Sequence, residues 1–321
     1  MKIVVLDGYT LNPGDLDWKG IERFGDVTVY DRTQYNTKDI LKNIGDAEVI
    51  FTNKTPLNSD VINKAPNIKY IGVLATGYNV VDVESAKNSN IIVTNIPDYS
   101  SKAVSQFTMG LLLELCHHIG HHNKAVQNGD WIKSKDFSFW NYPLIELSGK
   151  TIGIIGFGKI GRATAKLAQA FGLHIKVYNR TTYKALESES LTFVSLDELL
   201  KTSDIISLHC PLSKDTEGII NASTLSQMKD GAMLINTSRG PLIIEDDLKT
   251  ALNNGKLSGA AVDVISEEPM NESNPLLNAK NCIITPHIAW ATKEARTRLM
   301  QTAANNLGAF LDGKPINVVN K

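Results

Sequence analysis

Residues 151–180, TIGIIGFGKIGRATAKLAQAFGLHIKVYNR, restrict the possible folds of this chain more than any other stretch. An apolar run leads into the pattern Gly-x-Gly-x-x-Gly, which is formed by Gly156, Gly158 and Gly161. A helical pattern follows, and a second apolar run begins at His174. A strand, a glycine turn, a helix and a second strand in this order predict the start of a doubly wound parallel sheet.

The same glycines fit a backbone that binds a dinucleotide. Gly156 allows a tight turn, Gly158 lets the backbone approach a pyrophosphate, and Gly161 lets the helix pack against its strand. The amides of Lys159 and Ile160 open the helix and would face the phosphates, with attraction from the helix dipole. A chance glycine turn in a domain without a nucleotide is the alternative, and the complete strand–helix–strand context argues against it.

Short apolar strands alternate with helical segments along nearly the whole chain. This pattern is typical of parallel sheets covered by helices on both faces. The predicted strands are residues 2–7, 26–31, 47–52, 68–75, 91–95, 151–156, 174–179, 204–209, 232–237, 259–264 and 282–287.

The length of 321 residues exceeds what one hydrophobic core usually serves, so two domains are expected. A long helix is predicted to run from Ser101 to about Gly120, and a last one over residues 293–311. The last helix has little room in the second sheet, so we expect it to pack on the first. The predicted fold is α/β: a Rossmann dinucleotide-binding domain at 101–289, and a smaller, discontinuous flavodoxin-like substrate-binding domain at 1–100 and 290–321.

The composition excludes several classes of partner. The net charge is only −1, so neither nucleic acid nor an anionic membrane is expected. The N-terminal apolar run is too short for a signal peptide, and no run approaches the length of a membrane span. Cys116, Cys210 and Cys282 are odd in number and far apart, which favours free thiols and a cytoplasmic location.

The end of the second Rossmann strand bears on the choice of cofactor. An acidic residue there binds the adenosine ribose and repels a 2′-phosphate. This chain has Asn179 instead, followed by Arg180, which can pair with a phosphate. NADP(H) is therefore slightly favoured over NAD(H) as the cofactor, unless Arg180 merely covers the adenine face.

An arginine, a carboxylate and a histidine follow three consecutive predicted strands. They are Arg239, one of the two glutamates Glu267 and Glu268, and His287. The spacing does not show which of the two glutamates is involved. Ligands bind beyond the carboxyl ends of parallel strands, so these side chains should converge on the cofactor. Alternatively, Arg239 is a surface phosphate ligand and His287 a core histidine.

This set suits hydride transfer to a ketone, because charge that develops on the carbonyl oxygen needs a proton donor. A histidine held charged by a carboxylate can supply that proton near neutral pH. Arg239 can bind a substrate carboxylate through two parallel hydrogen bonds. The predicted reaction is the reversible reduction of a 2-keto acid by a nicotinamide cofactor.

Four motifs, GFGKIG, INTSRGPLI, AVDVISEEP and ITPHIA, resemble in this order the D-isomer-specific 2-hydroxyacid dehydrogenases over nearly the whole chain. The resemblance implies that Arg239 orients the substrate, Glu268 is the carboxylate of the acid–base pair, and His287 is the proton donor. It also implies that backbone amides around Thr76 and Gly77 bind the substrate carboxylate as the domains close. The residues that it implies at the cofactor are Thr108, Cys210, Pro211, Thr216, Thr237, Ser238, Asp263 and His287.

Within this family the chain is most similar to the glycerate dehydrogenase and hydroxypyruvate reductase branch. This similarity implies hydroxypyruvate or glyoxylate as substrate, D-glycerate or glycolate as product, and a homodimer. It places Lys54, in TNKTPLN, at the substrate mouth, and Trp140 on an arm used in dimer contacts. Trp140 is either a specificity residue for the partner subunit or an ordinary interface aromatic. Ala289 and Trp290 depart from the family, in which Gly and Ser are common.

Two other functions stay open. A non-catalytic dinucleotide-sensing protein can have the same fold, although the intact Arg239, Glu268 and His287 argue against it. A dehydrogenase for a bulkier 2-keto acid is the second. The formate dehydrogenase branch would have no acidic partner for the histidine. A phosphoglycerate substrate would require more basic residues in the first domain.

Four of the seven histidines, His117, His118, His121 and His122, fall within six residues. The pairs spaced by four could chelate a metal on an exposed helix. Gly120 interrupts the helix, however, and no carboxylate lies in the cluster. Hydride transfer needs no metal, so we predict no metal site and place the cluster at a helix end near the domain junction or the dimer interface.

Overall fold

The computed structural model describes all residues, 1–321, and its contacts divide the chain into two units. Unit 1 comprises Met1–Ser100 and Ala291–Lys321, and unit 2 comprises Ser101–Trp290. The second boundary lies one residue beyond the predicted one. The last helix, α12 (Lys293–Leu311), has the predicted bounds and belongs to unit 1, where it packs against strand β4 (Tyr70–Val73). No helix of the chain is both long and apolar enough to cross a membrane.

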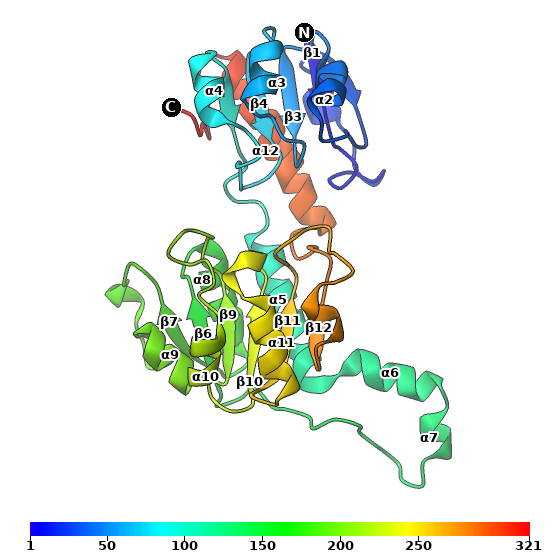
Figure 1. Cartoon of the computed structure of the whole chain (residues 1–321), viewed down its shortest axis with the longest axis vertical. Helices are drawn as coiled ribbons and strands as arrows, with labels where there is room; N and C mark the ends of the chain where they lie inside the picture. Colours follow the sequence, from blue (N-terminus) through cyan, green and yellow to red (C-terminus); the bar gives the residue numbers. More distant parts are fainter. The chain divides into compact units, whose positions relative to one another are not determined.

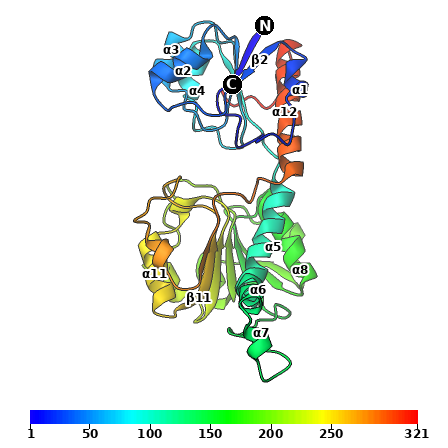
Figure 2. The same ribbon diagram turned by 90° about the vertical axis from the view of Figure 1, so that its right-hand side faces the viewer.

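Unit 1 is a five-stranded parallel sheet in the order β2-β1-β3-β4-β5. Helices α2, α3 and α4 cover one face and α1 and α12 the other (Figures 1 and 2). The remaining strands are β1 (Lys2–Val5), β2 (Asp26–Val29), β3 (Val49–Thr52) and β5 (Ile92–Thr94). The remaining helices are α1 (Lys19–Glu22), α2 (Thr37–Ile44), α3 (Ser59–Lys64) and α4 (Val83–Asn88).

The local sequence explains these elements. Strand β3 is buried at every position, as expected for a parallel strand covered on both faces. Helices α2, α3 and α4 each begin after a side chain that accepts a hydrogen bond from a first-turn amide, namely Asn36, Asn58 and Asp82. Asn and Asp therefore set where these helices start.

Unit 2 is a seven-stranded parallel sheet in the order β12-β11-β10-β9-β6-β7-β8, which is the predicted Rossmann arrangement with one added strand. Helices α5 and α8 cover one face, and α9, α10 and α11 pack on the other (Figure 2). The strands are β6 (Thr151–Ile155), β7 (His174–Tyr178), β8 (Leu191–Phe193), β9 (Ile205–Leu208), β10 (Ala232–Asn236), β11 (Leu257–Val262) and β12 (Cys282–Ile284). The helices are α5 (Ser101–His117), α8 (Lys159–Ala170), α9 (Leu196–Thr202), α10 (Ala222–Gln227) and α11 (Glu245–Asn253), with short 3-10 turns at η1 (Lys184–Leu186), η2 (Gly240–Leu242) and η3 (Pro275–Asn278).

The prediction of six strands in this sheet was wrong, because it missed β8. This strand has only three residues and lies at the edge, where it pairs with β7 alone. A strand so short gives too few alternating positions to be read from its sequence.

The long helix ends three residues earlier than predicted. Helix α5 stops at His117 because His118 adopts the left-handed conformation, with φ of 48°. Two further helices, α6 (Ile119–Gln127) and α7 (Asp130–Lys133), then leave the body of unit 2, and the chain returns through residues 134–146 (Figure 1). Residues 119–146 together form the arm.

Candidate functional site

The closest contact between predicted catalytic residues joins His287 and Glu268. His287 Nδ1 lies 2.6 Å from Glu268 Oε2, and about a third of each side chain is exposed. An ionised carboxylate only accepts, so Nδ1 donates the hydrogen bond and Nε2 is the nitrogen left for other chemistry. The spacing in the sequence left Glu267 and Glu268 as alternatives, and the structure shows that Glu268 contacts His287.

Asp263 holds the loop that carries His287. Its Oδ1 accepts from the Thr285 hydroxyl at 2.6 Å and the Ile288 amide at 2.9 Å, and its Oδ2 accepts from the Ala289 amide at 2.9 Å. Asp263 is only 1% exposed, so these bonds lie in a dry environment where they are strong. The sequence predicted a place for Asp263 beside the cofactor; the structure adds a role in fixing the backbone on both sides of His287.

The unusual Trp290 also serves this loop. Its indole Nε1 donates to the carbonyl of His287 at 2.8 Å, while His287 itself adopts φ of 54°. The departure from the family pattern at this position therefore supplies a further contact to a strained residue.

Arg239 lies on a turn that packs directly against the loop leading to Glu268. Asn236 fixes this turn, because its Oδ1 accepts from the Ser238 amide and its Nδ2 donates to the carbonyl of Arg239. A Cβ on Gly240 would lie 1.9 Å from the carbonyl carbon of Ile265. Only glycine permits this approach. Asn236 and Gly240 were not singled out from the sequence.

The glycine turn has the shape that a dinucleotide phosphate requires. A Cβ on Gly156, which has φ of 98°, would lie 2.4 Å from the amide nitrogen of Cys210, and one on Gly161 would lie 2.2 Å from the carbonyl oxygen of Gly156. A Cβ on Gly158 would meet nothing within 4 Å. The first and third glycines are thus fixed by protein neighbours, whereas the second faces open space.

Helix α8 begins directly after this turn. Lys159 and Ile160 are its first residues, and the N-cap residue Gly158 makes no side-chain capping hydrogen bond. Amides at a helix N-terminus bind anions readily. The residues present therefore fit a bound dinucleotide.

Asn179 is bonded at both ends of its side chain. Its Oδ1 accepts from the Phe157 amide at 2.9 Å, and its Nδ2 donates to the carbonyl of Thr181 at 2.7 Å. It thereby ties the glycine turn to the turn that carries Arg180, which is exposed. The sequence predicted the absence of a negative charge here but not this bridging contact.

Most other predicted cofactor residues lie around the same carboxyl edge of the unit 2 sheet. The hydroxyls of Thr108 and Thr237 are 3.1 Å apart and buried, and the Ser238 hydroxyl donates to the carbonyl of Leu208. The Thr216 hydroxyl donates to the carbonyl of Pro211 at 2.7 Å. Cys210 is buried, and burial raises the pKa of its thiol to about 11. A thiol of that pKa is a poor nucleophile, so a packing role suits Cys210.

The predicted substrate residues of unit 1 follow adjacent strands. Lys54 lies two residues beyond β3 and is exposed, while Thr76 and Gly77 lie beyond β4. The Thr76 hydroxyl donates to the carbonyl of Ile96 at 2.7 Å, and its own carbonyl accepts from Asn95. These residues therefore share one edge of the unit 1 sheet.

The histidine cluster ties the returning chain of the arm to α6. His122 Nδ1 contacts the carbonyl of His118 at 2.9 Å, and its Nε2 accepts from the Asn141 amide at 3.1 Å. His121 Nε2 lies 3.0 Å from Asn141 Nδ2, and the His118 ring stacks on Tyr142. The structure contains no group of three or more His, Cys, Asp or Glu side chains arranged to hold a metal ion.

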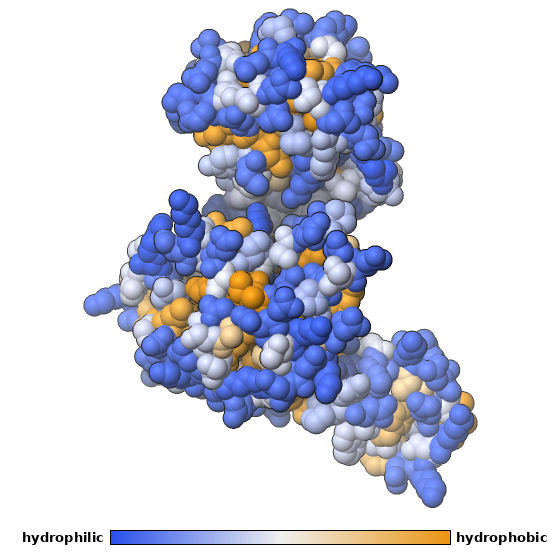
Figure 3. Space-filling model, viewed as in Figure 1, coloured by the Kyte–Doolittle hydropathy of each residue, from blue (hydrophilic) through white to orange (hydrophobic).

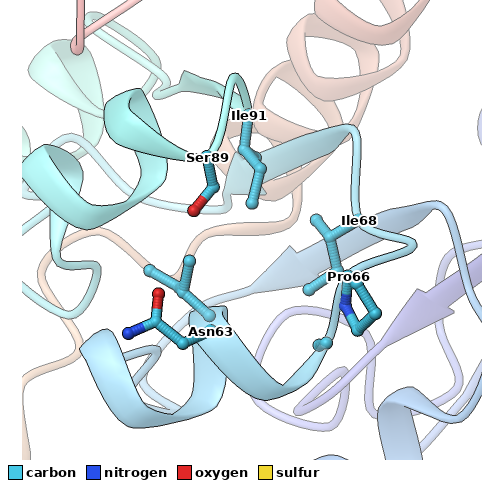
Figure 4. Close-up of a pocket in the computed structure, with 7 residues that line it drawn as sticks. Asn63, Pro66, Ile68, Ser89 and Ile91 are labelled. Carbon is cyan, nitrogen blue, oxygen red and sulfur yellow. The ribbon is translucent and has the colours of Figure 1, made fainter.

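A cavity of about 230 Å³ in unit 1 is lined by none of these residues. Its lining carries no charged group and includes Asn63, Pro66, Ile68, Ser89 and Ile91 (Figure 4). Such a lining has no acidic or basic side chain for proton transfer, so the candidate chemistry stays at the sheet edges.

Known proteins share both the sequence and the fold. Residues 109–289 match the sequence profile of the D-isomer specific 2-hydroxyacid dehydrogenase, NAD binding domain. The chain is 58% identical over 322 residues, covering 100% of both chains, to the hydroxypyruvate reductase of Blautia hydrogenotrophica. It is 39% identical to the glycerate dehydrogenase of Methylorubrum extorquens, covering 89% of each chain. The structure of an acyclic imino acid reductase in complex with NADPH and D-Arg superposes with a TM-score of 0.84 at 32% identity, covering 99% of this chain and 100% of that one.

The chain belongs to the D-isomer-specific 2-hydroxyacid dehydrogenase family. This dehydrogenase binds a nicotinamide dinucleotide and acts on a small 2-keto or 2-hydroxy acid. The predicted family and the predicted pair of parallel α/β domains are confirmed.

Proposed function

We propose that this enzyme reduces hydroxypyruvate to D-glycerate, and glyoxylate to glycolate, with a reduced nicotinamide dinucleotide. The observation that carries the proposal is the 2.6 Å contact of His287 with Glu268, next in the sheet to the Arg239 turn. The 58% identity to a hydroxypyruvate reductase supports the choice of substrate.

The residues of unit 2 have separate roles in substrate binding and proton transfer. Arg239 binds the substrate carboxylate through two parallel hydrogen bonds and polarises the neighbouring carbonyl. His287 donates a proton from Nε2 to the carbonyl oxygen, while Glu268 accepts from Nδ1 and stabilises the protonated ring. The bound nicotinamide supplies the hydride. In the reverse direction neutral His287 accepts the hydroxyl proton.

In unit 1 we assign Lys54, Thr76 and Gly77 to substrate binding. The backbone amides at Thr76 and Gly77 are suited to the carboxylate, and the Lys54 ammonium adds a positive charge. The carbonyl of Thr76 accepts from the Asn95 side chain, and this bond helps to fix the loop that carries those amides.

In unit 2 we assign the cofactor to the glycine turn, the start of α8 and the predicted cofactor residues at the carboxyl edge of the sheet. NADP(H) is slightly favoured over NAD(H). Asn179 carries no negative charge, and its two hydrogen bonds order the turn that presents Arg180 to a 2′-phosphate.

We further infer a homodimer formed through the arm, and a cytoplasmic location consistent with three free cysteines. Ile132 and Phe137 are 89% and 91% exposed, and Trp131 and Trp140 are more than half exposed. Exposed apolar side chains therefore gather on the arm (Figure 3). Such a surface is typical of a protein interface. Sedimentation should give twice the chain mass of 35.2 kDa, and Phe137→Asp should yield monomers.

The experiment that tests the function follows the absorbance of the reduced nicotinamide with purified protein, using NADH and NADPH in parallel. Hydroxypyruvate, glyoxylate and pyruvate are the substrates. Rapid oxidation with hydroxypyruvate is the expected result. Binding of NAD(P)H without turnover of any of the three acids would favour a bulkier keto acid or a dinucleotide sensor.

A further inference from the structure

The loop that carries Lys54 is held by one buried carboxylate that the sequence did not single out. Asp7 follows β1, and residues 53–55 follow its neighbour β3. Asp7 Oδ1 accepts from the Asn53 amide at 2.7 Å, and Oδ2 accepts from the amides of Lys54 at 2.6 Å and Thr55 at 2.7 Å. Three consecutive amides therefore converge on one side chain.

The surroundings of this carboxylate are dry and otherwise ordered. Asp7 is 9% exposed and Thr55 is fully buried. The Thr52 hydroxyl donates to the carbonyl of Thr55 at 2.7 Å and closes the loop, and Asn53 Nδ2 donates to the hydroxyl of Thr10, in the segment after β1. Charge-assisted hydrogen bonds are strong in such an environment, so the backbone at Lys54 has little freedom.

Lys54 is the exception within this fixed loop, since its side chain is exposed while its neighbours are buried. A flexible side chain loses entropy when it binds a ligand, and a fixed backbone lowers the remaining cost. An immobile loop that presents one exposed ammonium is what a small anionic substrate needs.

We propose that Asp7 is a positioning residue that fixes the Lys54 backbone and thereby sets the affinity for the 2-keto acid. The inference rests on the proposed function, in which Lys54 binds substrate. Asp7 does not touch the substrate itself, because both of its oxygens are already bonded to the loop.

The test compares Asp7→Asn, Lys54→Met and the double variant. An amide keeps one acceptor oxygen but places an NH₂ against a backbone N–H, so at least one bond is lost. The KM for hydroxypyruvate should rise about tenfold in Asp7→Asn, with kcat and the KM for NAD(P)H within about twofold of wild type. The double variant should match Lys54→Met, because Asp7 acts through Lys54.

Asp46→Asn is the matched control, since Asp46 lies at the opposite end of these strands and pairs with Lys2 on the surface. It should leave every kinetic constant unchanged. A multiplicative rise of KM in the double variant, or a fall of kcat alone in Asp7→Asn, would overturn the proposal.

Hydrogen exchange on the wild-type protein covers the case in which Asp7→Asn does not fold. The amides of Asn53, Lys54 and Thr55 should exchange slowly, and exchange as fast as that of an exposed loop would overturn the inference. A wild type inactive on hydroxypyruvate would instead refute the proposed function while the exchange rates still report on Asp7. An unchanged KM in Lys54→Met, with an active wild type, would refute the inference and the assignment of Lys54 to substrate binding, while the proposed reaction would stand.

Discussion

At the carboxyl edge of each sheet, a buried aspartate accepts hydrogen bonds from the loop that follows a neighbouring strand, but the two loops carry side chains with different proposed roles. In unit 1, Asp7 follows β1 and accepts from the loop beyond β3; in unit 2, Asp263 follows β11 and accepts from the loop beyond β12. Each loop carries a basic side chain. Lys54 is exposed, and His287 contacts Glu268 at 2.6 Å.

The difference reflects the proposed role of each side chain. An ammonium that binds an anion acts as a charge with three rotatable donors, so its orientation matters little. A proton donor must keep one tautomer and one direction, because the other ring nitrogen faces the substrate. Proton transfer therefore requires a fixed contact on the His287 side chain in addition to a fixed loop.

Replacing His287 should reduce activity more than any other change considered. His287→Ala should lower kcat by about 10³-fold, since no other group replaces the proton donor. Fluorescence titration with NADH and NADPH should show nearly unchanged affinity. A kcat within about tenfold of wild type would remove His287 as the donor.

The second prediction concerns how the stability of the protein depends on pH. It involves a histidine of unit 2, which contains all seven histidines of the chain. His209 Nε2 contacts the Ser207 hydroxyl at 2.9 Å, while Nδ1 is buried without a partner. Burial lowers the pKa of His209 from an ordinary 6.5 to about 4. Below pH 6.5 the unfolded chain therefore takes up a proton that the folded chain does not accept until the pH nears 4.

The stabilising contribution of neutral His209 is complete above pH 6.5 and is lost as the pH falls toward 4. The wild type should lose at most about 3 kcal/mol of unfolding free energy from this group over that range. Urea unfolding of wild type and His209→Gln at several pH values measures the difference. Parallel curves for the two proteins would contradict the prediction.

Asp263→Asn compares the two aspartates directly. The loss of loop bonds at His287 should lower kcat by about 100-fold, in contrast to the effect on KM expected for Asp7→Asn. Steady-state kinetics with both variants under one set of conditions provides the test. If both variants changed only KM, the proposed distinction between the two edges would fail.

The mildest change is expected in the choice of cofactor. Arg180→Ala should raise the KM for NADPH about tenfold and leave that for NADH nearly unchanged, because only NADPH carries the 2′-phosphate. Lys184→Ala, on the 3-10 turn η1 of the same segment, is the control. Equal changes with both cofactors would assign Arg180 to the adenine face instead.

The order of strands and helices could be predicted because each short segment carries its own signal. Apolar runs, the Gly156–Gly158–Gly161 spacing and the periodicity of α12 are local patterns, and each produced the expected element. The predictions failed where that signal was weak, at the three-residue edge strand β8 and at His118, whose left-handed backbone ends α5.

Local patterns along the chain were enough to predict the family, the parallel sheets and the residues that come after each strand, including Arg239, Glu268 and His287. Parallel strands bring their carboxyl ends to one edge, so the residues just beyond the strands already approximate a site. The contacts that hold those residues in place became visible in the folded molecule. Asp7 lies 46 residues from Asn53 and Asp263 lies 26 residues from Ala289, and a hydrogen bond between such distant groups forms only when the whole sheet has brought their loops together.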